Sequence, residues 1–112
     1  MSISYGIAQE IGLRPSMEDA HAIYDISEEG LFSAEVYDGH SGRNAADVSA
    51  EMLTPHFLSL LKSKRFGSVY TKSDYGELLR EAYLATDDYI VKRGIRSGTA
   101  AATLHIFDEV FL

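Results

Sequence analysis

Apolar side chains alternate with small or polar ones over the first part of the chain, and this period of two predicts strands. One such stretch is Ile3–Gln9, and Ala20–Ile26 and Leu31–Tyr37 follow it. The polar segment Ser27–Gly30 is short enough for a hairpin turn, so the two strands beside it are expected to be antiparallel neighbours. The second of these strands is expected to end where Asp38-Gly39-His40 begins.

The spacing of apolar residues becomes helical after Ser41-Gly42. From Ala45 to Leu61 the apolar positions approximate one face of a helix. Pro55 lies inside this stretch and cannot donate a backbone hydrogen bond, so a kink or break is expected near Leu53–Thr54.

A second, longer helical pattern follows a polar loop at Lys62–Lys72. Asp74 and Glu77 resemble a capping box that starts the helix, and Gly94 is suited to the left-handed position that ends it. The residues predicted for its buried face are Leu78, Leu79, Ala82, Tyr83, Thr86, Tyr89 and Ile90.

The last part of the chain returns to a strand pattern. Thr99–Phe107 is expected to be a strand, Asp108-Glu109 a turn, and Val110–Leu112 the start of another strand. A natural domain rarely ends on the first apolar residues of a strand, so the chain is expected to be truncated here. Strands, two long helices and further strands together predict an α+β fold.

The amino-acid composition limits the partners, the metal sites and the cellular compartment expected for this chain. The chain has 112 residues, no cysteine, and a net charge of −7 from 17 acidic and 10 basic residues. The acidic balance argues against a nucleic-acid partner, and the absence of cysteine excludes disulfides and thiolate metal sites. No stretch resembles a signal peptide or a membrane span, so a cytosolic protein without a membrane partner is expected.

Several charged residues are expected to meet at one edge of the sheet. If the strands on either side of Ser27–Gly30 pair directly, the start of the first and the end of the second lie at the same edge. The residues that this pairing gathers are Arg14, Glu18, Asp19, Asp38 and His40.

Such a group could act on a phosphate ester. Carboxylate and carbonyl oxygens suit Mg²⁺ or Mn²⁺, so Asp38 could bridge two metals, with Glu18 and the Gly39 carbonyl beside it. Arg14 could hold phosphate oxygens, and His40 could protonate the departing alkoxide. Taken singly, each residue has a plainer interpretation as a turn, cap or surface charge, and both interpretations stay open on this basis.

Three segments, taken in order, resemble motifs of the PPM family, the type 2C metal-dependent serine/threonine protein phosphatases. Arg14–His21 is similar to the family's first motif, with Met-Glu-Asp after an arginine. Val36–Gly42 is similar to its second motif, and Gly94–Ala101 to the small-residue segment after the second helix. Ala100 departs from the hydroxyl residue common at its position.

The resemblance implies a fold, a reaction and a role for each residue. The fold would be a four-layer α-β-β-α sandwich, with residues 1–112 as the N-terminal part of one domain. The reaction would be hydrolysis of phosphoserine and phosphothreonine in proteins by a water activated between two divalent cations, Mn²⁺ or Mg²⁺. Asp38, Glu18 and the Gly39 carbonyl would bind metal and Asp19 would orient metal-bound water, while Arg14 would bind the substrate phosphate and His40 would be the general acid.

The family's later metal-binding aspartates lie beyond Leu112, so the remaining C-terminal half of the domain would be needed for a complete site. The 112 residues alone are therefore expected to be inactive. The alternative function is a non-catalytic pseudophosphatase or a fragment that binds a partner.

Overall fold

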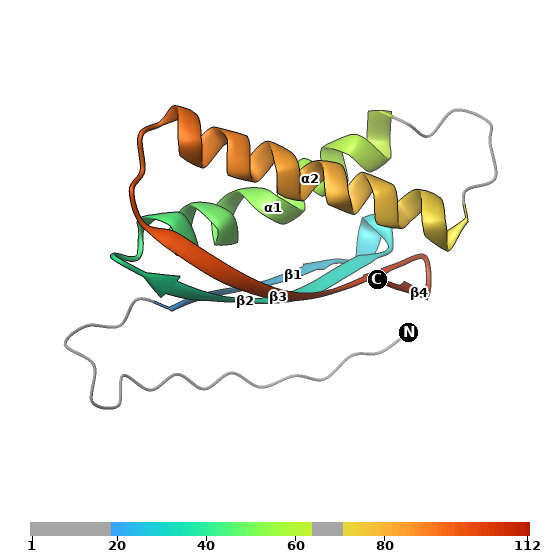
Figure 1. Cartoon of the computed structure of the whole chain (residues 1–112). Coiled ribbons are helices and arrows are strands. Elements are labelled where there is room, and N and C mark those ends of the chain that lie inside the picture. The colour runs from blue at the N-terminus through green and yellow to red at the C-terminus, as the bar shows by residue number, and fades with distance from the viewer. Residues whose placement is uncertain (1–18, 64–70) are drawn as a thin grey trace.

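The computed structural model of the chain describes residues 19–63 and 71–112, which form a sheet covered by two helices (Figure 1). The sheet has four strands in the order β1-β2-β3-β4, and every neighbouring pair is antiparallel. In chain order the elements are β1 (Ala20–Ile26), a 3₁₀ turn (Ser27–Glu29), β2 (Leu31–His40), α1 (Asn44–Ser63), α2 (Lys72–Lys92), β3 (Gly98–Phe107) and β4 (Val110–Phe111). The α+β class predicted from the sequence is confirmed.

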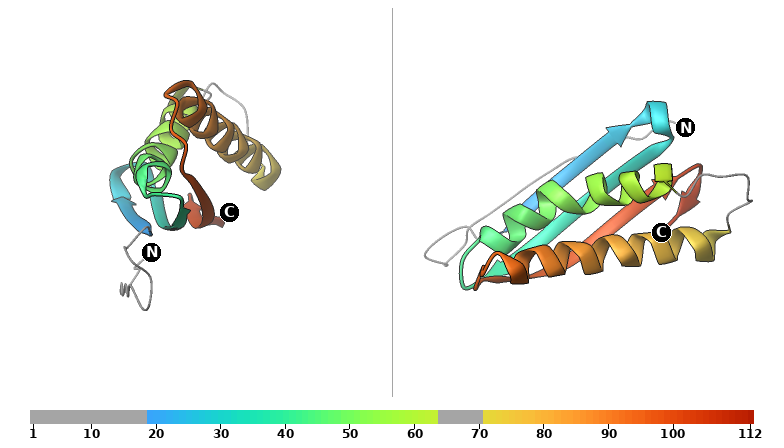
Figure 2. Two further views of the ribbon diagram at one scale, coloured as in Figure 1. Left: turned by 60° about the vertical axis from the view of Figure 1, so that its left-hand side comes forward. Right: turned by 90° about the horizontal axis from the view of Figure 1, so that it is seen from above.

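Both helices lie on the same face of the sheet and run along the direction of its strands (Figure 2). Side chains of β2 alternate between this face and the opposite one, so Leu31 and Tyr37 are buried under the helices while Val36 is exposed on the other side. The core lies between the layers, where Phe57 of α1 and Ala82 of α2 are fully buried. The described part of the chain is therefore a two-layer unit.

The strand predictions hold for most of the described residues. β1 has the predicted bounds, and the left-handed Gly30 closes the turn that joins it to β2. The prediction that β2 ends at Tyr37 is wrong, because Asp38, Gly39 and His40 continue to pair with β3. The backbone of β3, which comes from much later in the chain, extends the strand beyond its apolar stretch. The predicted strand Ile3–Gln9 lies outside the described residues.

The sequence predicts a kink or break near Leu53–Thr54, and the break is wrong, because α1 is one continuous helix through Pro55. Proline leaves the carbonyl of Glu51 without its helical donor, but Glu51 and Pro55 both lie on the exposed side of α1, where water can supply one. On the opposite side, Leu53 and Phe57, one before and one after the proline, are both buried in the core.

Helix α2 begins earlier than predicted. Thr71 is its N-cap and forms a capping box with Asp74, which accepts a hydrogen bond from the Thr71 backbone N–H at 2.8 Å. Asp74 is thus the third residue of the first turn rather than the cap, and Lys72 is helical rather than part of a loop. The predicted face is confirmed by the burial of Leu78, Ala82 and Thr86. Neither described helix is long and apolar enough to cross a membrane.

Replacing Gly76 by alanine should stabilise the chain. Gly76 lies inside α2, and a Cβ added there meets no atom within 4 Å, so alanine removes backbone freedom from the unfolded state without a clash. Urea unfolding of Gly76→Ala should give a free energy of unfolding higher by about 0.5–1 kcal/mol. Gly94→Ala is the control, because φ at Gly94 is +68° and a side chain there is strained. A lower stability for Gly76→Ala would contradict the helix assignment.

Candidate active site

The end of β2, the start of α1 and the start of β3 meet at one edge of the two-layer unit (Figure 1). Asp38 and His40 alternate with Gly39 along β2, so both point to the face opposite the helices and both are exposed. Gly39 points to the helix side and is buried. The carboxylate and the imidazole therefore share one face of the sheet, at its open end.

Asp19 reaches the same edge from the neighbouring strand. The register pairs Ala20 of β1 with Tyr37 of β2, so Asp19 and Asp38 are the next residues along each strand. The antiparallel pairing expected of the hairpin is thus confirmed, and it brings Asp19, Asp38 and His40 to one edge, while their roles stay predictions. Two other predicted members of this group, Arg14 and Glu18, lie outside the described residues.

The oxygen atoms at this edge fit a hard divalent cation in part. Asp19 and Asp38 supply carboxylates and Gly39 supplies a carbonyl, which are the ligand types that Mg²⁺ and Mn²⁺ prefer. In residues 19–63 and 71–112, no group of three or more His, Asp or Glu side chains is gathered closely enough to hold a metal ion. The oxygens that the described residues bring to this edge are therefore of a suitable type but too few for a metal site.

Arg43 brings a positive charge to this edge that the sequence interpretation did not include. Its guanidinium donates to both carboxylate oxygens of Asp47, with Nε at 3.0 Å from Oδ2 and Nη2 at 3.0 Å from Oδ1. These hydrogen bonds, then the charge of Asp47, and more weakly the charge of Asp19, raise the pKa of Arg43. Arg43 is thus held by the first turn of α1, and the charge of Asp19 acts on it more weakly.

The segment before β3 supports the start of α1. Ser97 Oγ accepts a hydrogen bond from the backbone N–H of Ala45 at 2.9 Å, which satisfies a donor that a helix N-terminus leaves unpaired. The left-handed residues Ser41 and Gly42 turn the chain between β2 and α1, and a Cβ added at Gly42 would lie 3.5 Å from the Cβ of Ser97. The small-residue segment Gly94–Ala101 therefore supports the N-terminus of α1 through Ser97, a role that its sequence alone did not reveal.

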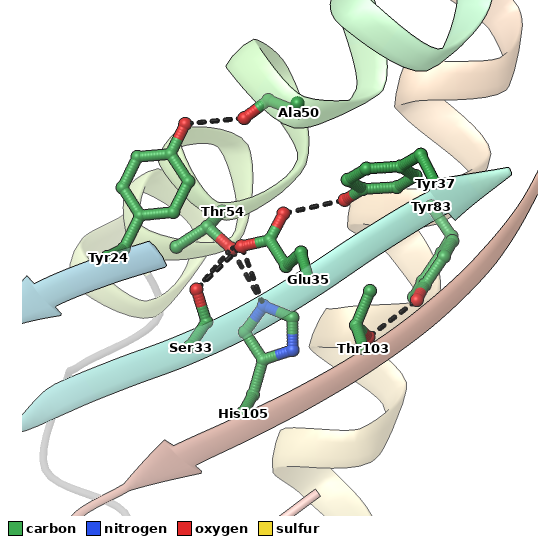
Figure 3. A network of polar contacts seen from close by, with 9 residues as sticks. All are labelled: Tyr24, Ser33, Glu35, Tyr37, Ala50, Thr54, Tyr83, Thr103 and His105. Atoms are coloured by element: carbon green, nitrogen blue, oxygen red, sulfur yellow. Dashed lines mark hydrogen bonds and ion pairs between the residues drawn. The ribbon is translucent and has the colours of Figure 1, made fainter. Parts of the chain in front are cut away.

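A network of buried polar side chains lies between β2 and the helices (Figure 3). Its β2 members immediately precede the exposed Asp38 in the sequence. The carboxylate of Glu35 is 2% exposed and accepts hydrogen bonds from three hydroxyls: Ser33 at 2.6 Å, Tyr37 at 2.6 Å and Thr54 at 2.5 Å. Thr54 belongs to α1, so this network joins the helix to the strand that carries Asp38. Burial, followed by the hydrogen bond to Glu35, raises the pKa of Tyr37.

His105 of β3 also belongs to this network, through its contact with Thr54. Its Nε2 lies 2.7 Å from Thr54 Oγ1, and because that hydroxyl donates to Glu35, Nε2 carries the hydrogen. Nδ1 is then an acceptor, and no described residue donates to it. Burial lowers the pKa of His105 to about 4 and outweighs the attraction of Glu35 Oε2, 3.9 Å away.

Sequence interpretation did not identify this network, although a signal was present. Ser33 and Glu35 occupy the same alternate positions of β2 as Leu31 and Tyr37, which is the buried face. Polar residues at buried positions of a strand require hydrogen-bond partners. Their partners, Thr54 and His105, come from distant parts of the chain and could not be named from spacing.

Comparison with known proteins gives a family match over nearly the whole chain. The family described as "Protein phosphatase 2C" matches residues 3–111. The chain is 32% identical over 93% of its length to "Probable protein phosphatase 2C 74" of Oryza sativa subsp. japonica, covering 28% of that protein. It is 29% identical over 94% of its length to "Probable protein phosphatase 2C 14" of Arabidopsis thaliana, covering 23% of it. The chain thus spans about a quarter of the length of these relatives.

Replacing Thr54 by valine should destabilise the fold. Valine keeps the shape of threonine but removes the hydroxyl, so Glu35 loses a donor and His105 Nε2 loses its acceptor inside the core. The free energy of unfolding should fall by about 1–3 kcal/mol, measured by urea unfolding. Thr103→Val is the matched control, because its hydroxyl bonds only the half-buried Tyr83 and should matter less. Equal effects for the two variants would contradict the importance of the buried network.

Stability should fall as the pH is lowered from about 6.5 towards about 4. Between these values an unfolded His105 is protonated and the buried folded one is not, so the unfolded state binds more protons. The neutral ring's contribution is fully present above pH 6.5 and is lost as pH falls towards the folded pKa, at roughly 1.4 kcal/mol per pH unit. Urea unfolding at a series of pH values should give a shallower dependence for His105→Gln than for the wild type. Identical slopes would show that His105 is protonated in the folded state.

Proposed function

This chain belongs to the protein phosphatase 2C family, and on that premise we propose that it is the N-terminal part of a single domain that hydrolyses phosphoserine and phosphothreonine in proteins. The family match supports a phosphatase, and the α+β unit of one sheet and two helices is consistent with the first part of that family's fold. The greater length of the relatives supports a domain that continues beyond these residues.

The observation that carries this proposal is the register that gathers Asp19, Asp38, Gly39 and His40 at one end of the sheet. In the proposed site Asp38 would help to hold both of two divalent cations, Mn²⁺ or Mg²⁺, and Glu18 and the Gly39 carbonyl would complete this chain's share of the ligands. When bound, the cations would neutralise phosphate charge and lower the pKa of a water shared between them. Asp19 would orient that water.

Protein side chains supply the remaining steps. Arg14 would hold the substrate phosphate with two hydrogen bonds from its guanidinium group. As the water oxygen bonds to phosphorus and the ester P–O bond breaks, His40 would give a ring proton to the departing serine or threonine oxygen. The exposure of His40 and Asp38 on one face supports these roles, because a protein substrate must reach both.

Exposed apolar side chains on the face of the sheet away from the helices support the proposal that the rest of the domain is needed. Val36 is 56% exposed and Leu104 is 42% exposed, and both lie on this face beside the small residues Ala100 and Ala102. A second sheet supplied by the remaining C-terminal half would cover these apolar side chains and bring the missing metal ligands to the edge that holds Asp38. A cytosolic setting stays a prediction from the sequence.

Replacing Asp38 by asparagine in the full-length phosphatase should abolish Mn²⁺-dependent hydrolysis of a phosphoserine peptide. Asparagine keeps the size of the side chain but removes the charge needed to bridge two cations. The rate should fall by at least about a hundredfold, the scale for losing one main source of transition-state charge stabilisation. Asp25→Asn is the control, because Asp25 is exposed on the same face at the other end of β1 and should retain the activity.

Near-normal hydrolysis by Asp38→Asn would overturn the bridging role. A wild-type full-length protein that leaves phosphoserine peptides intact in the presence of Mn²⁺ would instead favour the non-catalytic alternative, a pseudophosphatase or partner-binding protein.

A further inference from the structure

We propose that Gly98 is a positioning residue for His40, because the imidazole ring of His40 occupies the space where a side chain at residue 98 would lie. The inference rests on the proposed function, in which His40 protonates the leaving oxygen. Gly98, which lies on a different strand from His40, would then help to position the group that donates this proton.

The contact follows from the register of β2 with β3. His40 pairs with Gly98, and paired residues of antiparallel strands lie on the same face of the sheet. A Cβ built on Gly98 would collide with His40 Nε2 and would lie 3.0 Å from Cε1 and 3.1 Å from Cδ2 of the same ring. These three ring atoms are the nearest heavy atoms to that position, so the ring is the neighbour that a side chain at residue 98 would displace.

Backbone conformation does not explain the glycine. Gly30, Gly42 and Gly94 have positive φ values, which most side chains avoid, but Gly98 is in an ordinary strand conformation. An alanine at residue 98 would therefore meet no backbone strain. Among the described residues its nearest obstacle is the imidazole ring of His40, and within that ring the Nε2 atom.

Neighbouring contacts fix Gly98 relative to the rest of the edge. Ser97 Oγ accepts the hydrogen bond from the backbone N–H of Ala45 at the start of α1, and a Cβ added at Gly42 would lie 3.5 Å from the Ser97 Cβ. The backbone on which the ring lies is thus tied to the loop that follows His40. The ring over Gly98 lies on the same face of the sheet as Asp38, two residues earlier on β2.

A methyl group at residue 98 should push the ring away from the strand and impair proton donation. The loss should depend on the leaving group, because a serine alkoxide is strongly basic and needs a proton, whereas p-nitrophenolate is stable without one. A general structural defect or weaker metal binding would slow both substrates alike.

The test compares four forms of the full-length phosphatase with Mn²⁺: wild type, Gly98→Ala, His40→Ala, and the double variant. For Gly98→Ala, kcat on a phosphoserine peptide should fall about tenfold to a hundredfold, within the range for losing general-acid catalysis, while kcat on p-nitrophenyl phosphate stays within about twofold. The double variant should be no slower than His40→Ala, because the effect of residue 98 acts through the ring. Gly76→Ala is the matched control, since the same methyl at Gly76 touches nothing and should leave both rates unchanged.

Equal losses on the two substrates, or a double variant slower than His40→Ala, would overturn the proposal. If Gly98→Ala does not fold, the thermal unfolding midpoint of the double variant decides: recovery towards that of His40→Ala identifies the ring as the obstacle, and no recovery rejects it. A wild-type protein that hydrolyses neither substrate would overturn the proposed function itself, and with it any role of Gly98 in positioning an acid.

Discussion

The antiparallel register of β2 with its two neighbours is the constraint on which the other features of this chain depend. It places Asp19, the residue before β1, beside Asp38, and Gly98 of β3 beside His40. Because side chains alternate along a strand, a slip of one residue would turn Asp38 towards the helices and would expose the buried Glu35. One register therefore sets both the chemistry at the edge and the composition of the core.

The buried network gives this register a strong energetic preference. Glu35 is enclosed and would be very unfavourable there without its three hydroxyl donors, which come from β2 itself and from α1. His105 adds the third element, β3, through its hydrogen bond to Thr54. Polar groups that satisfy one another in a single arrangement disfavour alternative pairings more sharply than apolar contacts do, since each unmade hydrogen bond leaves a buried polar atom unpaired.

Two differences between the sequence predictions and the structure involve distant parts of the chain. β2 extends through His40 because β3 pairs with it, and α1 continues past Pro55 with Leu53 and Phe57 of its buried side in the core. The earlier start of α2 has a local reason, since Thr71 caps the helix and Asp74 is the third residue of its first turn. Most of the elements were nevertheless predictable, because their periodicity reflects burial on one face, which the hydrophobic pattern records directly.

The sequence by itself determined the α+β order of elements, the hairpin of β1 and β2, and through it the approach of Asp19 to Asp38. These features follow from local periodicity and a short turn, and so they can be read from neighbouring residues. Only the tertiary structure decided that Thr54 and His105 meet Glu35, and that Gly98 lies beneath His40. Those contacts join residues far apart in the chain, and their partners are chosen by packing and strand register, which no local pattern specifies.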